Sequence, residues 1–424
     1  SGTRKKGLRN AIIYGASIII IYILIGFLVT LIMGPNGLNQ LSTNAIFNLI
    51  FFSIFVVFAL SFFGAFEITL PASWINKSES MSDKGGLIGI FFMAFTLALV
   101  SFSCTGPIIG TVLVEAAVGG SYAGPLLVMF GFSSALALPF ALFAMFPQLL
   151  QSLPKSGGWL NTVKVTIGFV ELALSLKFLS VPDLTYHWHI LDREVFLVLW
   201  IVIFAMLGFY LLGKLKFSHD SDLPFVTIPR LFFAITSFAF AVYLIPGLWG
   251  APLKAIAGFS PPKGTQDFDL FEAAHQAQEK NNQEKKNADI FHAPPGINAW
   301  FDYNQAMAVG KKLGKPVMID FTGWGCVNCR KMEEYVWSTP EVSKMLNDNY
   351  VLVSLYVDDR TPLPQAEQYV SKVTAKNIRT LGNKLADFQT QYLKTNSQPY
   401  YVLLDADGKQ LAPPSGSNFD KEIG

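Results

Sequence analysis

Cysteine and charge are both scarce in this sequence. Only 3 of its 424 residues are cysteine, which is too few for a small secreted domain stabilised by several disulfides. Charged residues make up 15% of the chain, whereas about 25% is usual in a soluble protein. The formal net charge is only +2, so the composition indicates no electrostatic surface for nucleic acid, and we expect no nucleic-acid partner.

The charges that are present are unevenly distributed. Few lie before residue 250 and many lie after it, while 51% of all residues are hydrophobic. This pattern predicts a polytopic α-helical membrane domain over residues 1–250, in contact with lipid, followed by a water-facing part. Seven apolar stretches are long enough to span a bilayer, which takes roughly 20 residues each. They are about Ala11–Met33, Ala45–Phe66, Leu87–Val114, Tyr122–Phe146, Val165–Val181, Val195–Gly213 and Leu231–Leu248.

Lysine and arginine in the short predicted loops indicate the orientation, because cytoplasmic loops are enriched in both. They gather before the first span and after the second, fourth and sixth spans, whereas the alternate loops contain only Arg193. The residues are Arg4, Lys5, Lys6, Arg9, Lys77, Lys84, Lys155, Lys164, Lys214, Lys216 and Arg230. A cytoplasmic N-terminus and seven spans together place everything after Gly250 outside the cytoplasm.

The C-terminal part, residues 298–424, has the composition of a soluble α/β domain. Residues 251–297 are predicted to be a linker, because the run Gln276–Asn287 is polar and has no apolar face. The stretch Thr361–Lys394 is predicted to be mostly helical. The other expected elements are helices Tyr303–Leu313, Arg330–Trp337 and Pro340–Asn347, and strands Lys315–Phe321, Tyr350–Val357 and Gln398–Leu404.

Cys326 and Cys329 form a C-x-x-C motif that follows the apolar run Pro316–Phe321 and precedes a predicted helix. Strand, turn, C-x-x-C and helix in this order are typical of a thioredoxin redox site. The two intervening residues let both sulfurs meet at the start of the helix and close a small disulfide ring. There the helix dipole stabilises the thiolate of the first cysteine, the nucleophile in disulfide exchange, and the second cysteine resolves the mixed disulfide.

Half of a zinc site is the alternative interpretation of the same motif. Structural zinc needs about four ligands at suitable spacing. The remaining cysteine, Cys104, lies far away in an apolar stretch, and no histidine follows the pair closely. We therefore expect redox chemistry and no bound metal.

The motifs of both halves resemble those of a known family. Asp320-Phe321, the C-x-x-C motif and Gln398-Pro399 are similar to the thioredoxin fold, and the membrane half carries Ser103-Cys104-Thr105-Gly106-Pro107. Joined in this order, they resemble the DsbD family of bacterial thiol:disulfide interchange proteins over nearly the whole chain. The resemblance implies a protein-disulfide reductase of the inner membrane, with a cytochrome c biogenesis-type transmembrane region that transfers electrons and a C-terminal α/β thioredoxin-like domain.

The resemblance also implies a path for the electrons. In the family, reducing power comes from NADPH through cytoplasmic thioredoxin to a pair of intramembrane cysteines. It then passes to a periplasmic thioredoxin-like domain and on to an N-terminal immunoglobulin-like domain. The implied partners are therefore cytoplasmic thioredoxin and periplasmic thiol-disulfide proteins, including those of cytochrome c maturation. No bound cofactor is implied, because the redox-active group is the Cys326–Cys329 disulfide.

Five residues of the C-terminal domain receive roles from this resemblance. Cys326 is the attacking cysteine, Cys329 resolves the mixed disulfide, and Pro399 is a cis-proline that faces the disulfide. Asp320 matches a buried acid that takes the proton of Cys329, and Glu333 matches an acidic position on the same helix face. The residues alone leave alternatives open: Asp320 as a strand-end acid bonded to backbone, Glu333 as a solvated helix charge, and Pro399 as a trans residue of an edge strand.

Two features depart from the family pattern. Trp324 lies one residue farther from Cys326 than in ordinary thioredoxins, which puts a role as the substrate platform in doubt. The family has eight spans, and the first carries the partner of the cysteine that matches Cys104. That span has no counterpart here and the chain opens with Ser-Gly, so we expect a fragment of a longer protein.

Cys104 by itself has the pattern of a small packing residue in an apolar helix. Gly106 and Pro107 break that helix near mid-membrane, where irregular backbone is tolerated only beside protein or a water-filled cavity. Together with the resemblance, this favours a redox role for Cys104. Two other functions stay open: a membrane transporter, which does not need Cys104, and a tethered thioredoxin-like binding or chaperone module without net electron transfer, which could lose Cys329.

Overall fold

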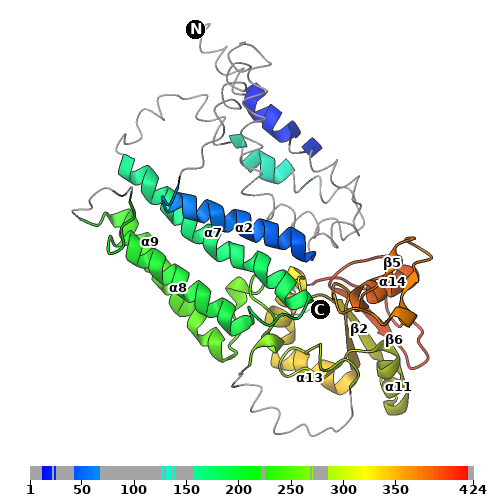
Figure 1. Cartoon of the computed structure of the whole chain (residues 1–424). Helices are drawn as coiled ribbons and strands as arrows, with labels where there is room; N and C mark the ends of the chain where they lie inside the picture. Colours follow the sequence, from blue (N-terminus) through cyan, green and yellow to red (C-terminus); the bar gives the residue numbers. More distant parts are fainter. Residues whose placement is uncertain are drawn as a thin grey trace. The chain divides into compact units, whose positions relative to one another are not determined.

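The computed structural model describes part of the chain (Figure 1). The described residues are 12–21, 23–24, 43–66, 127, 130–135, 137–138, 157–218, 220, 225–267, 270 and 285–418, with side chains from 161 onward in the range 157–218. Cys104, the predicted span Leu87–Val114 and most of Tyr122–Phe146 lie outside these residues.

The chain divides into two compact units, which are treated separately below. One unit contains Ser1–Ser42, Ile54–Glu171 and Lys216–Pro224, and the second contains Thr43–Ser53, Leu172–Leu215 and Phe225–Gly424. The second unit therefore includes the C-terminal domain together with parts of the apolar helices. The predicted domain boundaries near residues 250 and 298 stay a prediction.

Four helices in the described part of the chain are long and apolar enough to cross a membrane. They are α2 (Ala45–Phe62), α7 (Gly157–Thr185), α8 (Arg193–Leu211) and α9 (Ile228–Leu244). They coincide with four of the seven predicted spans, and this confirms the polytopic helical region. The total of seven spans stays a prediction. Of the other three, one shows only the shorter apolar helix Ile12–Ile21 in its described part, and two fall wholly or largely on residues that are not described.

Helices α8 and α9 run alongside each other (Figure 1). Aromatic rings fill their contact, with Phe204 and Phe240 at 4.5 Å between ring centroids. The indole of Trp200 donates a hydrogen bond to the Ala173 carbonyl of α7, 2.9 Å away, which links α7 to the pair. Near the start of α9, Phe232 and Phe233 are each 65% exposed, as expected for a surface that faces lipid.

The described part of the expected linker is packed rather than extended. It contains two short 3₁₀ helices, η2 (Lys254–Ile256) and η3 (Lys263–Thr265), and a further one, η1 (Ile245–Trp249), directly precedes it. Leu253 and Ile256 are buried against α8. Packing onto the neighbouring helix removes these apolar side chains from water, which is favourable. Most of the polar run Gln276–Asn287 is outside the described residues.

The C-terminal domain is built on a mixed sheet with strand order β1-β3-β2-β6. The strands are β1 (Ala299–Trp300), β3 (Val351–Tyr356), β2 (Val317–Thr322) and β6 (Tyr400–Leu404). Strands β1 and β2 run parallel to β3, whereas β6 runs antiparallel to β2. All six residues of β3 are buried, so the central strand separates two apolar clusters, one on each face of the sheet. This confirms the predicted α/β thioredoxin-like fold.

Local sequence explains the helices that cover this sheet. The Asp302 side chain accepts a hydrogen bond from the Gln305 amide and so caps α11 (Tyr303–Leu313), which ends at Gly314 with φ of 64°. Thr380 caps α14 (Leu381–Leu393) in the same way. The third helix is α13 (Pro340–Asn349), with proline in its first turn.

The prediction that Thr361–Lys394 is mostly helical is wrong for its first half. That half contains the short 3₁₀ helix η5 (Gln365–Glu367) and a small antiparallel pair of strands, β4 (Tyr369–Val370) and β5 (Asn377–Ile378). Pro362 and Pro364 explain the absence of a helix there, because proline lacks the amide hydrogen that a helix interior needs.

Candidate active site

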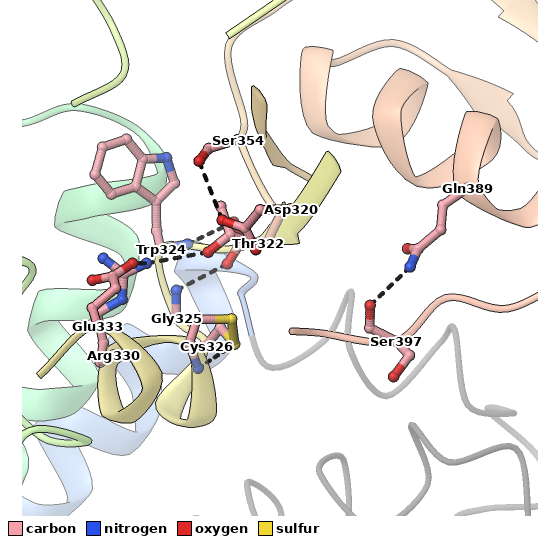
Figure 2. Close-up of a disulfide and its surroundings, with 12 residues drawn as sticks. Asp320, Thr322, Trp324, Gly325, Cys326, Arg330, Glu333, Ser354, Gln389 and Ser397 are labelled. Carbon is pink, nitrogen blue, oxygen red and sulfur yellow. Dashed lines mark hydrogen bonds and ion pairs between the residues drawn. A yellow bond between two sulfur atoms is a disulfide. The ribbon is translucent and has the colours of Figure 1, made fainter. Parts of the chain in front are cut away.

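The predicted strand, turn, C-x-x-C and helix occur in this order. Strand β2 ends at Thr322, and α12 (Val327–Met332) begins after Cys326, whose sulfur accepts a hydrogen bond from the Cys329 amide at 3.1 Å. Cys326 and Cys329 form a disulfide with their Cα atoms 5.3 Å apart (Figure 2). In the reduced protein the same amide donor would stabilise a thiolate on Cys326.

The two cysteines differ in exposure. Cys329 is buried, with 2% of its surface exposed, whereas Cys326 is partly exposed. The Cys326 sulfur is therefore the more accessible of the two to a reacting thiol or disulfide. This is the asymmetry that an attacking and a resolving cysteine require, although the roles themselves stay a prediction.

Asp320 lies on β2 beneath the disulfide turn and is 2% exposed. Its carboxylate accepts a hydrogen bond from the Ser354 hydroxyl at 3.2 Å, so the partner is a side chain of the neighbouring strand β3. The pKa of Asp320 is raised to about 7, chiefly by burial. Nearby Glu333 contributes to the rise, and Arg330 opposes it. A carboxyl with this pKa can both accept and return a proton near neutral pH.

Glu333 is not the solvated helix charge of the alternative interpretation. Its side chain is 13% exposed and forms an ion pair with Arg330 at 2.8 Å. Burial raises the pKa of Glu333 to about 7, and the Arg330 guanidinium opposes that rise. Glu333 begins the π-helical turn η4 (Glu333–Trp337), a distortion that often occurs at functional sites because it re-aims side chains.

The Gln398–Pro399 peptide bond is cis, which settles the alternative left open for Pro399. It immediately precedes β6, the antiparallel neighbour of β2. On the other side of the turn, a Cβ on Gly323 would come within 2.7 Å of an Asp358 carboxylate oxygen, so the close approach of these segments requires glycine there.

Asp358 and Asp359 are site residues that the sequence interpretation missed. Asp358 accepts hydrogen bonds from the amides of Trp324 and Gly325, at 2.8 and 2.9 Å. Burial raises its pKa to about 6, while these two bonds lower it. Asp359 accepts a hydrogen bond from the Trp324 indole at 3.1 Å. Their position in the sequence could have indicated them, because both acids directly follow the predicted strand Tyr350–Val357.

Trp324 is a core residue of this domain rather than a surface platform. It is 3% exposed, and its ring lies 4.6 Å from that of Tyr356 between centroids. The sequence position had already put a platform role in doubt, and the burial gives the physical reason.

Residues from the ends of the apolar helices complete the surroundings of the site within the second compact unit. His187, after α7, lies 2.8 Å from the Asp359 carboxylate, and Arg193, in the first turn of α8, lies 3.2 Å from Glu334. A cavity of about 250 Å³ opens beside Trp324, with His187, His189 and His292 among its lining residues. Among the described residues, no group of three or more histidine, cysteine or acidic side chains is arranged to hold a metal ion.

Comparison with known proteins gives matches for both halves of the chain. Residues 1–181 match the cytochrome c biogenesis protein transmembrane domain, and residues 298–406 match a thioredoxin-like domain. The thiol:disulfide interchange protein DsbD of Pseudoalteromonas atlantica is 28% identical over 319 residues, which cover 73% of this chain. The DsbD proteins of Vibrio vulnificus and Vibrio cholerae are 26% and 27% identical and cover 82% and 85% of it. Both halves of this chain are therefore similar to the corresponding parts of DsbD proteins.

The chain spans about half the length of the DsbD relatives it matches: the alignments cover 46%, 52% and 53% of those three proteins. The transmembrane match includes Cys104, which lies outside the described residues. The thioredoxin-like match includes Asp320, Cys326, Cys329 and Pro399. The match to the transmembrane domain and the four apolar helices of the described part together make this a multi-pass membrane protein.

Proposed function

We propose that this protein is a membrane thiol:disulfide oxidoreductase that passes reducing equivalents through intramembrane cysteines, Cys104 among them, to the Cys326–Cys329 disulfide. The observation that carries the proposal is the pairing of a partly exposed Cys326 with a buried Cys329 above the buried acid Asp320. The names of the relatives, which describe thiol:disulfide interchange proteins, support the same chemistry.

Each transfer consists of two exchanges. A donor thiolate attacks the Cys326 sulfur, and Cys329 leaves as a thiolate and takes a proton. A second donor thiol then displaces Cys326, so the donor pair becomes a disulfide and the Cys326–Cys329 pair gains two electrons and two protons. The reverse sequence reduces a substrate: the Cys326 thiolate attacks its disulfide, and Cys329 then attacks Cys326 to release the second substrate thiol.

Asp320 handles the proton of Cys329 in this scheme. Because Cys329 is shielded from water, its thiol needs an internal base when it resolves the mixed disulfide and an internal acid when it leaves. Asp320 is buried under the turn and has a pKa of about 7, raised chiefly by burial, so both protonation states are populated near neutral pH. Glu333 and Arg330 form the neighbouring ion pair and adjust the charge around Asp320.

The partners and location follow from the same proposal. Cytoplasmic thioredoxin, supplied by NADPH, is the electron donor, and disulfide-bonded proteins of the envelope, including those of cytochrome c maturation, are the acceptors. The protein lies in the bacterial inner membrane with its thioredoxin-like domain in the periplasm. The lysine and arginine asymmetry of the predicted loops supports this orientation.

Cys104→Ala tests the relay in the full-length protein. We expect Cys326 and Cys329 to remain oxidised in cells, because the donor side loses one of its two sulfurs. A thiol label that shifts the protein on a gel reports the redox state. Ser103→Ala, one residue away, is the matched control and should leave the pair reduced. If the pair stays reduced in Cys104→Ala, the relay is wrong, and the transporter and tethered-module interpretations become preferable.

Cysteine labelling tests the orientation. In a background with Cys104, Cys326 and Cys329 replaced by alanine, Lys312→Cys places a thiol at an exposed position of the C-terminal domain. We expect a membrane-impermeant maleimide to label it in intact spheroplasts, whereas Lys5→Cys should be labelled only after permeabilisation. Protection of the Lys312→Cys thiol until permeabilisation would contradict a periplasmic domain.

A further inference from the structure

The turn that carries the disulfide lies against the ends of the apolar helices, all within the second compact unit. A Cβ on Gly258, just after η2, would lie 2.6 Å from a methyl carbon of Val327. A Cβ on Gly325 would lie 3.6 Å from a methyl carbon of Val181 in α7. Gly325 and Val327 flank Cys326, so the surface around the attacking sulfur is already in contact with another part of the chain.

A buried ionic cluster lies on one side of this turn; we call it the arginine clamp, and it consists of Arg193, Lys263 and Glu334. Arg193 is 1% exposed and Glu334 is 4% exposed. The Arg193 guanidinium lies 3.2 Å from one oxygen of Glu334 and donates to the Pro261 carbonyl at 2.7 Å, while Lys263 lies 3.4 Å from the other oxygen of Glu334. Glu334 follows the C-x-x-C helix, so the clamp attaches that helix to α8.

A second set of contacts involves the loop after β3; we call it the histidine clamp, and it consists of His187, Asp359 and Arg360. His187 lies 2.8 Å from the Asp359 carboxylate, whose side chain is fully buried. The next residue, Arg360, donates from its guanidinium to the Thr43 hydroxyl at 2.7 Å and from its amide to the Thr185 carbonyl at 3.0 Å. The histidine clamp attaches the loop after β3 to the segment before α2 and the end of α7.

The two clamps pair groups from different parts of the chain. The helix side and the segment after it supply the cations Arg193 and Lys263 and the imidazole of His187, and the thioredoxin-like domain supplies the acids Glu334 and Asp359. A buried charge is strongly unfavourable without its partner, so such pairs specify one arrangement more than they add stability. Two clamps, one after the C-x-x-C helix and one after β3, therefore define a single register for the domain.

We infer that α7, α8 and the segment 253–265 form an intramolecular docking site for the active-site face of the thioredoxin-like domain, with Arg193 and His187 as positioning residues. The docked face contains Cys326, so a protein substrate cannot occupy the same surface. Docking and substrate reduction then exclude each other, and the domain must leave the clamps to act on an external disulfide. The inference deepens the proposed function, since the docked state is the one that can receive electrons from the membrane.

An engineered disulfide measures docking directly. The ideal Cβ position of Gly258 lies 3.7 Å from the Cβ of Val327, close to the ~3.8 Å average for disulfides. We combine Gly258→Cys and Val327→Cys in the full chain, with Cys104, Cys326 and Cys329 replaced by alanine, in lipid nanodiscs. Mild oxidation should join the two sulfurs rapidly, and a protease cut in the linker between them should leave the fragments attached until reduction.

Clamp variants in this background test the two positioning residues. We expect Arg193→Gln and His187→Ala each to lower the initial cross-linking rate at least about tenfold, because each removes a side chain that attaches a buried acid to the helix ends. The double variant Arg193→Gln/Glu334→Gln should lower the cross-linking rate by less than the two single changes combined. A general loss of folding would not produce this difference. Lys311→Gln breaks the exposed Lys311–Asp407 pair and should leave the rate unchanged.

The outcomes separate this inference from the relay. Cross-linking uses no native cysteine, so a failed relay leaves its result unaffected. Unchanged rates in both clamp variants would overturn the docking site, and so would equal losses in the clamp variants and in Lys311→Gln. His187 has a 22% exposed side chain outside the helices, so His187→Ala provides a decisive result even if Arg193→Gln does not fold.

Discussion

Cys326→Ser is expected to abolish disulfide reduction by this protein, with a loss of about 10³-fold or more, because a serine hydroxyl is not ionised at neutral pH. Cys329→Ser is expected to behave differently. Its Cys326 still attacks, but nothing resolves the product, so a mixed disulfide with the substrate accumulates. The contrast follows from the exposure of the two cysteines, since Cys326 is the more accessible of the two.

Each protein is first reduced with dithiothreitol, which is then removed. A single turnover of a disulfide-bonded protein is followed on non-reducing gels and by mass spectrometry of the adduct. Both variants keep the size of the side chain, and each serves as the control for the other. Two results would reverse the assigned roles: an adduct that forms through position 329 in Cys326→Ser, or full turnover by Cys329→Ser.

Asp320→Asn is expected to slow the resolution step by about 10²-fold, in the range usual for loss of a general acid or base. With Asp320 in place, resolution should become faster as the pH rises through about 7, because the carboxylate form accepts the Cys329 proton. The variant should lack this dependence. Ser354→Ala is the matched test: it removes the hydrogen bond that favours the carboxylate, so the same dependence should move to higher pH.

The same substitution has a predicted effect on stability. The ordinary pKa of the Asp320 carboxyl is 3.8, and burial raises it to about 7 in the folded protein. The folded state therefore binds more protons over this interval, and stability decreases as the pH rises through it. Asp320→Asn should remove this loss, so the gain in unfolding free energy should be larger at pH 8 than at pH 5 and at most about 4 kcal/mol, at ~1.4 kcal/mol per pKa unit.

Thermal unfolding of the purified protein at the two pH values provides the check. Glu333→Gln is the necessary companion variant, because the pKa of Glu333 is also raised by burial to about 7 and its titration would overlap. If Asp320→Asn gives the same gain at both pH values, Asp320 does not titrate in the proposed range, and another group must take the proton of Cys329.

Local patterns predicted the core of the C-terminal domain well. The apolar runs around Pro316–Phe321 and Tyr350–Val357 became β2 and β3, and the C-x-x-C motif lies at the start of α12. Such elements depend on residues that are neighbours in the chain, which a sequence shows directly. The first half of Thr361–Lys394 differs from the prediction because its polar composition suits both a helix and a hairpin, and Pro362 and Pro364 disfavour the helix.

The sequence by itself determined that this is a protein with apolar spans, a thioredoxin-like domain and a dithiol motif, since each of these depends on composition, short-range periodicity or spacing. Only the tertiary structure decided what surrounds the motif. His187 and Asp359 are 172 residues apart in the chain, and Arg193 and Glu334 are 141 apart. No local pattern predicts which charged residues, far apart in the sequence, will be buried next to each other. That depends on how the helices and strands pack and exclude water from both side chains.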